Sequence, residues 1–168
     1  AKIRAIKNHG CIKRFHHKYI GLNGRLDTIQ AAILNIKFDY FEDTLKKRNN
    51  CANYYSENLK FLEDKSLLKL PIVKENSTSS WAQYSILAKS KIERDNIVDF
   101  LKENKVNVAI FYPKPLHLQE CFNYLNYKKN DLPVTENVCD TIFNLPCYAE
   151  LTNEEQDYII SILVKYFN

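Results

Sequence analysis

Hydrophobic residues from Arg25 to Leu59 recur at the three- and four-residue spacing of an amphipathic helix. The stripe begins with Leu26, Ile29, Ile33 and Ile36. No Pro or Gly interrupts it, so the pattern predicts one long helix, straight or bent, whose first turns are buried. Because such a helix exceeds the usual globular length, we expect it to cross from one domain to another.

The segments on either side of this helix alternate between shorter predicted elements. A short helix and an exposed loop from Asn8 to Leu22 precede it. A polar loop at 74–80 comes after Pro71. Runs rich in β-branched and aromatic residues predict strands at 81–88 and 106–112 and a third short strand at 143–145.

Three further helices are marked by their first residues. Ser90 with Glu93, and Thr152 with Glu155, have the spacing of capping boxes. Pro133 suits the first turn of a helix that runs through residue 142. Before it, Pro113 and Pro115 favour an extended turn, since proline fixes its own φ and restricts the preceding residue.

These elements predict an α/β fold with two or three antiparallel strands, covered by helices and attached to the long helix. We expect residues 1–60 to form an arm, a loop and the connecting helix, and residues 61–168 to form a small α/β domain. A length of 168 residues is enough for one core, or for a core with an arm. A hydrophobic content of 45% excludes a disordered chain.

Charge and cysteine content restrict the class of protein. A net charge of +4 is modest for a nucleic-acid-binding protein, so we expect no nucleic-acid partner. The basic run 13–18 either attracts phosphate or forms a solvated loop. Five cysteines without CxxC spacing favour reduced thiols in a cytoplasmic protein, and no apolar run suggests a membrane span. The adjacent His16 and His17 point in different directions, so we expect no metal site.

Several sequence blocks resemble the DegT/DnrJ/StrS family of pyridoxal-phosphate (PLP) dependent aminotransferases, which act on nucleotide-linked keto-sugars. The blocks occur in family order and are AKIRAIKNHG at 1–10, GLNGRLDTIQAAIL at 21–34, FYPKPLHLQ at 111–119, PVTE at 133–136, FNLP at 143–146 and LTNEEQDYII at 151–160. The chain thereby resembles the C-terminal part of such an enzyme, including the small domain of a fold-type I aminotransferase.

The resemblance implies no catalytic residue in this chain, because the lysine that holds PLP covalently lies upstream in the family's large domain. We therefore expect PLP in the full-length enzyme but not on this chain alone. The absence of Met and the opening Ala1 favour a translation start far upstream. Three alternatives stay open: part of a complete enzyme, a split gene product that complements an N-terminal chain, and a non-catalytic module that binds a sugar nucleotide or a partner.

Two polar residues in the 21–34 block are candidates for phosphate or substrate binding. The resemblance implies that Asn23 reaches the PLP phosphate across a homodimer interface; its alternative role is a helix N-cap. Arg25 either forms an ion pair with Asp27 or a partner chain, or binds a carboxylate or phosphate of the sugar nucleotide through its planar guanidinium group.

Three further residues match family positions near the sugar. The resemblance implies substrate binding by His17, Tyr112 and His117, while packing at the proline turn is the alternative role of Tyr112 and His117. Two positions depart from the family, since Phe111 stands where relatives carry His or Tyr, and Gly24 stands where Ser or Tyr is common.

The implied reaction is a two-step transamination. An amino group passes from a donor, commonly glutamate, to the cofactor and then to a keto-sugar on a nucleotide diphosphate. The 14–34 segment resembles most the branch that aminates C3 of a keto-uronic acid on a UDP-sugar. Surface polysaccharide synthesis is the setting associated with the family.

Overall fold

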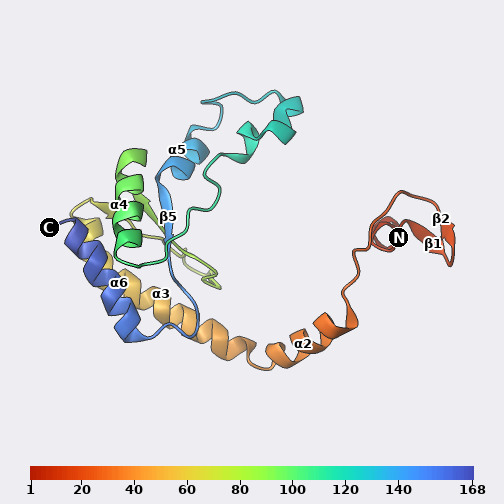
Figure 1. The fold of residues 1–168 in the computed structure, drawn as a ribbon, viewed down its shortest axis with the longest axis horizontal. Coiled ribbons are helices and arrows are strands. Elements are labelled where there is room, and N and C mark those ends of the chain that lie inside the picture. The colour runs from red at the N-terminus through yellow and green to blue at the C-terminus, as the bar shows by residue number, and fades with distance from the viewer. The chain divides into compact units, whose positions relative to one another are not determined.

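The computed structural model describes residues 1–168, which divide into two compact units, 1–42 and 43–168. The secondary structure is a mixture of helices and small antiparallel sheets, so the predicted α/β class is confirmed. Figure 1 labels the elements of both units.

The N-terminal unit contains two helices and a short hairpin. Its elements are α1 (Lys2–Ile6), β1 (Cys11–Lys13), β2 (His16–His17) and α2 (Thr28–Phe38). The two strands are antiparallel, with Cys11 opposite His17. This hairpin lies in the segment predicted to be only an exposed loop.

Gly10 is required where the chain crosses itself near the hairpin. Its φ of 76° lies in the left-handed region, and a Cβ atom there would collide with the carbonyl oxygen of Tyr19. The backbone N–H groups of Lys18 and Tyr19 both donate to the Gly10 carbonyl oxygen. Glycine therefore lets two backbone segments approach closely enough to hydrogen-bond.

The predicted long helix is divided, and no residue of its first part is buried. Residues Asp39 and Tyr40 separate α2 from α3 (Phe41–Asp64). No residue of α2 is buried, and Ile29 is 76% exposed. The prediction that the first turns are buried is therefore wrong for the isolated chain, because nothing in the N-terminal unit covers their apolar side chains.

The C-terminal unit is built on a three-stranded antiparallel sheet of order β3-β4-β5. After α3, its elements are β3 (Leu68–Lys69), β4 (Tyr84–Ala88), α4 (Lys91–Glu103), the 3-10 helices η1 (Leu116–Leu118) and η2 (Glu120–Leu125), α5 (Pro133–Thr141), β5 (Ile142–Leu145) and α6 (Asn153–Tyr166). The central strand pairs Tyr84 with Leu145 and Leu87 with Ile142. Figure 1 shows α3, α4 and α6 gathered around this sheet.

The predicted helix starts in this unit are largely as the sequence indicates. The Ser90 hydroxyl accepts the Glu93 N–H at the start of α4, and Pro133 opens α5. At α6 the capping box is complete, since Glu155 N donates to Thr152 Oγ1 and Thr152 N donates to Glu155 Oε2.

The predicted strand at 106–112 is wrong, and the strand predicted from Trp81 starts later. In the first segment only Ala109 pairs with a strand residue, through an isolated bridge to Asn144. Tyr112 has a φ of 57°, which bends the chain away from extended geometry. Trp81 has a φ of 45°, so β4 begins only at Tyr84.

The core of the unit is aromatic at its centre. The Tyr84 ring lies 5.1 Å from the Tyr55 ring and 5.7 Å from the Trp81 ring, measured between centroids. Its hydroxyl shares a 2.9 Å hydrogen bond with Ser56 Oγ. Burial raises the pKa of Tyr84 to about 12. The phenol is therefore a neutral packing group at physiological pH.

All five cysteines are free thiols. Cys51 on α3 and Cys147, just after β5, are both buried. A hydrogen bond with Cys147, together with burial, raises the pKa of the Cys51 thiol. Cys51 is therefore a protonated packing residue and a poor nucleophile.

Candidate functional site

Asn23 and Arg25 form a polar pair in the N-terminal unit. The Asn23 backbone pairs with Asn8, and Arg25 Nε donates to Asn23 Oδ1 over 3.1 Å. The α2 helix starts at Thr28, with Asp27 as its N-cap. Asn23 is therefore not the N-cap, and Arg25 makes no ion pair with Asp27 within the chain.

The hydrogen bond between Arg25 and Asn23 leaves other polar groups of both side chains available to a ligand. Because the Asn23 oxygen faces Arg25, the amide nitrogen is left without a partner in the chain. The terminal guanidinium nitrogens of Arg25 also make no hydrogen bond in the chain. The pair thus presents several N–H donors and one positive charge, which is the chemistry that binds a phosphate or a carboxylate. The residues present fit the phosphate of PLP.

His17 shares a cavity with Arg25. This cavity of about 600 Å³ lies in the N-terminal unit and is lined by Asn8, His9, Cys11, Ile12, Lys13, Arg14, Phe15, His17 and Arg25. His17 Nδ1 lies 2.9 Å from the His9 carbonyl oxygen. Since a carbonyl can only accept, Nδ1 carries the proton, and in the neutral ring Nε2 is an acceptor suited to a hydroxyl group.

Tyr112 and His117 line a second cavity, in the C-terminal unit. It has a volume of about 480 Å³, and its other lining residues are Phe111, Leu116, Phe122, Leu125, Leu132, Thr135, Val138, Cys139 and Ile142. Tyr112 is exposed, whereas His117 is buried. The structure therefore brings these two predicted residues together, but in a mostly apolar setting.

Glu136 holds His117 in place. His117 Nε2 lies 3.1 Å from Glu136 Oε1, which also accepts the backbone N–H groups of Asn130 and Leu132. His117 Nδ1 is buried and has no hydrogen-bond partner. Glu136 lies in the PVTE block, but no pattern in the sequence predicted a role for it. Its position in the first turn of α5 was the available signal.

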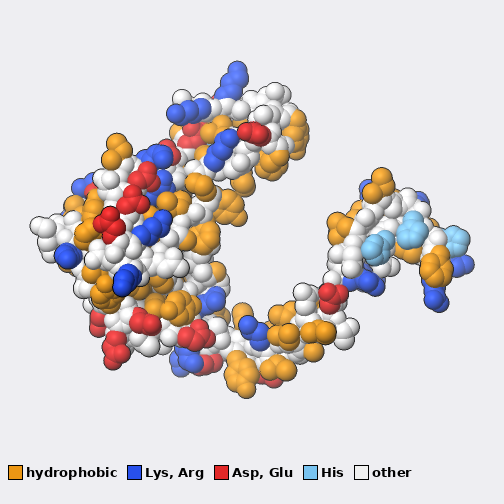
Figure 2. All heavy atoms as spheres, in the orientation of Figure 1, with side chains coloured by type: hydrophobic (Ala, Val, Ile, Leu, Met, Phe, Trp, Pro, Cys, Tyr) orange, Lys and Arg blue, Asp and Glu red, His pale blue; other side chains and the backbone are white.

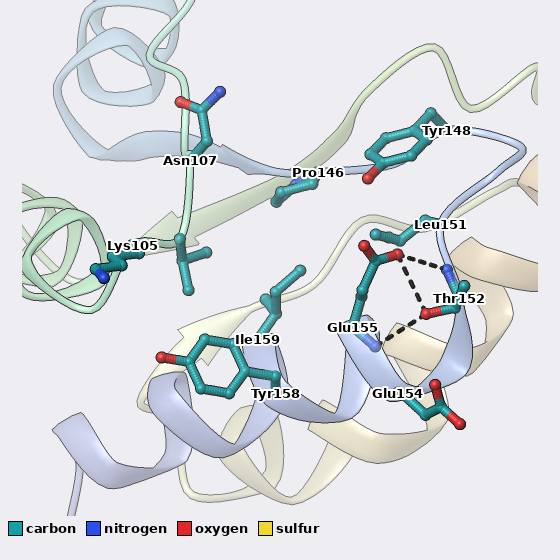
Figure 3. A pocket seen from close by; sticks show the side chains of 11 residues that line it. Lys105, Asn107, Pro146, Tyr148, Leu151, Thr152, Glu154, Glu155, Tyr158 and Ile159 are labelled. Carbon is teal, nitrogen blue, oxygen red and sulfur yellow. Dashed lines mark hydrogen bonds between the residues drawn. The ribbon is translucent and has the colours of Figure 1, made fainter.

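A further cavity contains none of the predicted residues. It measures about 880 Å³ and is lined by Lys105, Val106, Asn107, Pro146, Tyr148, Leu151, Thr152, Glu154, Glu155, Tyr158 and Ile159. Figure 3 shows the Glu155 carboxylate bonded to Thr152, as part of the capping box. Glu154 and Glu155 make this cavity unfavourable for a phosphate, since like charges repel.

No group of three or more His, Cys, Asp or Glu side chains is arranged to hold a metal ion. No helix is both long and apolar enough to cross a membrane. The polar side chains described above form two clusters, Asn23, Arg25 and His17 in the N-terminal unit and Tyr112, His117 and Glu136 in the C-terminal unit.

The family model of the DegT/DnrJ/EryC1/StrS aminotransferases matches residues 1–164. The chain belongs to this family. The resemblance found in the sequence blocks is thereby confirmed, and the chain corresponds to the C-terminal part of the family's enzymes.

Individual curated proteins match over most of the chain. The chain is 33% identical over 168 residues to a pleiotropic regulatory protein of Geobacillus stearothermophilus, covering 99% of this chain and 44% of the relative. It is 34% identical over 149 residues to the UDP-2-acetamido-2-deoxy-3-oxo-D-glucuronate aminotransferase of Pseudomonas aeruginosa, covering 89% of this chain and 39% of the relative.

A solved DegT DnrJ EryC1 StrS aminotransferase from Brucella abortus has the same fold. It superposes with a TM-score of 0.82 at 33% identity and covers 98% of this chain and 42% of its own. The chain thus spans less than half the length of the relatives it matches. The fold expected from a fold-type I aminotransferase's small domain is confirmed.

Proposed function

We propose that the chain is part of a PLP-dependent aminotransferase that transfers an amino group to the keto group of a nucleotide-linked sugar. Membership of the DegT/DnrJ/EryC1/StrS family is the observation that carries the proposal. Relatives are named as transaminases of UDP- and dTDP-linked sugars. Glutamate as the donor, a cytoplasmic location and a role in surface polysaccharide synthesis belong to the same proposal.

The Asn23–Arg25 pair supports the cofactor part of this proposal. Asn23 offers its amide N–H groups to the cofactor phosphate, while Arg25 keeps the amide in that orientation. The family is PLP-dependent, and one solved relative holds the pyridoxamine form. When bound, the cofactor acts as the electron sink of the reaction. The chain's own residues contribute binding and orientation, while the covalent lysine belongs to the family's large domain.

The substrate part rests on both polar clusters. His17 Nε2 accepts from a sugar hydroxyl, and Arg25 binds a carboxylate or phosphate group. Tyr112 contributes an exposed phenol. His117 contributes Nδ1, whose missing partner would be a ligand hydroxyl.

The exposed apolar face of α2 supports a dimer. Ile29, Ile33 and Ile36 are more than half exposed, although their spacing is that of a buried stripe. We assign this face to contact with the PLP-binding domain or a second protomer, and residues 1–60 to the connection with that domain. Such apolar patches on otherwise soluble proteins mark interfaces.

We therefore expect the isolated chain to self-associate. Light scattering after size-exclusion chromatography should give a mass above 19.8 kDa. The double change Ile29→Glu/Ile36→Glu should restore that monomer mass, because it places two charges on the face. The matched control is Ile92→Glu on α4, where Ile92 is 75% exposed, and it should leave the mass unchanged. A chain that is already monomeric contradicts the assignment.

The isolated chain should also be catalytically silent. With PLP, glutamate and a UDP-keto-sugar, we expect no product by mass spectrometry. Mixing with a PLP-binding large domain from the same family should restore transamination. Turnover by the chain alone would contradict the proposal that the large domain supplies the catalytic lysine. Binding of a UDP-sugar without any restored activity would favour the non-catalytic binding module.

The native size distinguishes a whole enzyme from a split one. An antibody to this chain can isolate the protein from its source cells for intact mass measurement. A species near twice the chain's mass is the expected result. A species of 19.8 kDa would favour a separate lysine-bearing partner chain.

A further inference from the structure

Positive charge is concentrated in the first residues of the chain. Residues 1–26 contain seven of the 24 Lys and Arg residues and none of the 20 Asp and Glu residues. The remaining residues carry 17 basic and 20 acidic side chains, a net charge of −3. Figure 2 shows Lys, Arg and His atoms gathered on the N-terminal unit. The modest net charge of +4 for the whole chain is therefore the sum of a strongly basic segment at 1–26 and a slightly acidic remainder.

None of these cations is neutralised within the chain. No ion pair involves any of the seven, although the C-terminal unit forms several between Lys or Arg and Asp or Glu. Their contacts are with rings or neutral groups, as where Arg14 lies 5.0 Å from the Phe15 ring centroid. Unpaired like charges repel one another, and a bound anion would relieve that repulsion. The positive charges therefore favour anion binding.

The charges converge on a cavity of small-molecule size. Lys13, Arg14 and Arg25 line the cavity of about 600 Å³ described above, together with His17 and Phe15. No acidic side chain lines it. Its volume lies within the range of about 300–1,000 Å³ that is usual for small ligands. A compact, multiply charged anion therefore fits better than an extended one.

The turn of the hairpin adds an aromatic surface. Strand β1 ends at Lys13 and β2 begins at His16, so Arg14 and Phe15 form the connection. Short turns of this kind favour Asn and Gly, because they require positive φ. Phe15 has a φ of 65° and its side chain is 80% exposed. A bulky residue in this conformation holds its ring out to solvent, where a nucleobase can stack on it.

We infer that the β1–β2 hairpin binds the nucleoside diphosphate part of the substrate, with Lys13 and Arg14 on the diphosphate and Phe15 against the base. The inference rests on the proposed function, because that function supplies a nucleotide-linked sugar. It adds residues 13–15 to the substrate contacts and places them in the same cavity as His17 and Arg25. Stacking on a ring does not distinguish bases, so uracil and thymine are both accepted.

The test is binding of UDP to the full 168-residue chain, measured by calorimetry at about 150 mM salt. We expect one UDP per chain, with UMP at least tenfold weaker and uridine not bound. Lys13→Ala/Arg14→Ala should weaken UDP binding about tenfold, which corresponds to about 1.4 kcal/mol shared between two exposed charge contacts. Phe15→Ala should weaken UDP and dTDP equally.

The matched control is Lys128→Ala/Lys129→Ala, which removes two exposed charges from the C-terminal unit and should leave UDP binding unchanged. Equal affinity for UDP and UMP, or an unchanged affinity in Lys13→Ala/Arg14→Ala, overturns the inference. If an oligonucleotide binds the chain and UDP does not, the basic residues belong to a nucleic-acid site, and this result also overturns the inference. Circular dichroism of each variant confirms that it is folded.

This test separates the inference from the function on which it rests. If a PLP-binding domain restores transamination but Lys13→Ala/Arg14→Ala leaves the UDP affinity unchanged, only the inference fails. If UDP binding needs both residues and no transamination is restored, the hairpin assignment holds and the proposed reaction fails.

Discussion

Phe143→Ala is expected to destabilise the C-terminal unit by about 3–5 kcal/mol, the usual cost of removing a fully buried phenylalanine side chain. Phe143 lies on β5 opposite Ile86, and its exposed fraction is 0%. Since a domain's total stability is about 5–15 kcal/mol, the variant should be close to unfolding at room temperature. Urea unfolding at low protein concentration, followed by circular dichroism, gives the free energy of unfolding.

Tyr124→Ala is the control for the same measurement. Tyr124 is an aromatic residue of the same unit but is 73% exposed. Its removal should change the free energy of unfolding by no more than about 0.5 kcal/mol. Equal losses in the two variants would contradict the placement of the core between β4, β5 and the helices.

The helices of this unit were predictable because their signals are local. Thr152 and Glu155 are three residues apart, and their reciprocal hydrogen bonds form within one turn. Pro133 similarly acts on its own turn. Such signals depend little on distant parts of the chain, so the sequence specifies them directly.

Strands were harder to predict because they depend on a distant partner. The composition of 106–112 favours a strand, yet the segment pairs with β5 only through the isolated bridge between Ala109 and Asn144. The Asn144 side chain donates its amide to the Ala109 carbonyl oxygen and also bonds Ser85. Side-chain bonds thus replace part of a regular ladder. No local sequence pattern indicates that side-chain hydrogen bonds take the place of backbone pairing here.

The division between α2 and α3 carries no sequence signal either. Neither Pro nor Gly lies near Asp39, and the apolar spacing continues across the break. The expected burial of α2 fails for a different reason, since its apolar stripe is real but is uncovered in this chain. The spacing of apolar residues predicts that one face of a helix is buried. It does not identify which surface covers that face.

The candidate site was predicted in part. Family blocks identified Tyr112 and His117, which line one cavity, and Asn23 and Arg25, which are hydrogen-bonded. Glu136 received no role because its contact with His117 spans 19 residues. The hairpin was missed because its strands are only two or three residues long and its turn lacks the usual Asn or Gly.

Asn23→Ala should lower transamination by the assembled enzyme about 10- to 100-fold, because a hydrogen bond to a charged group contributes roughly 1.5–3 kcal/mol. The same change should weaken cofactor binding, measured by the PLP concentration that restores activity to stripped enzyme. A control is Asn58→Ala on α3, an exposed asparagine whose amide bonds only the Tyr54 carbonyl within its helix. It should leave activity unchanged.

Asn23→Asp separates a phosphate contact from a merely structural one. Aspartate keeps an oxygen to accept from Arg25 Nε, and its charge would strengthen that bond. If Asn23 serves only to position Arg25, the aspartate variant should be milder than the alanine variant. If its amide donates to a phosphate, aspartate instead places a negative charge against the anion and loses the donor. We expect the second order of effects, with Asn23→Asp more damaging than Asn23→Ala in both activity and PLP affinity.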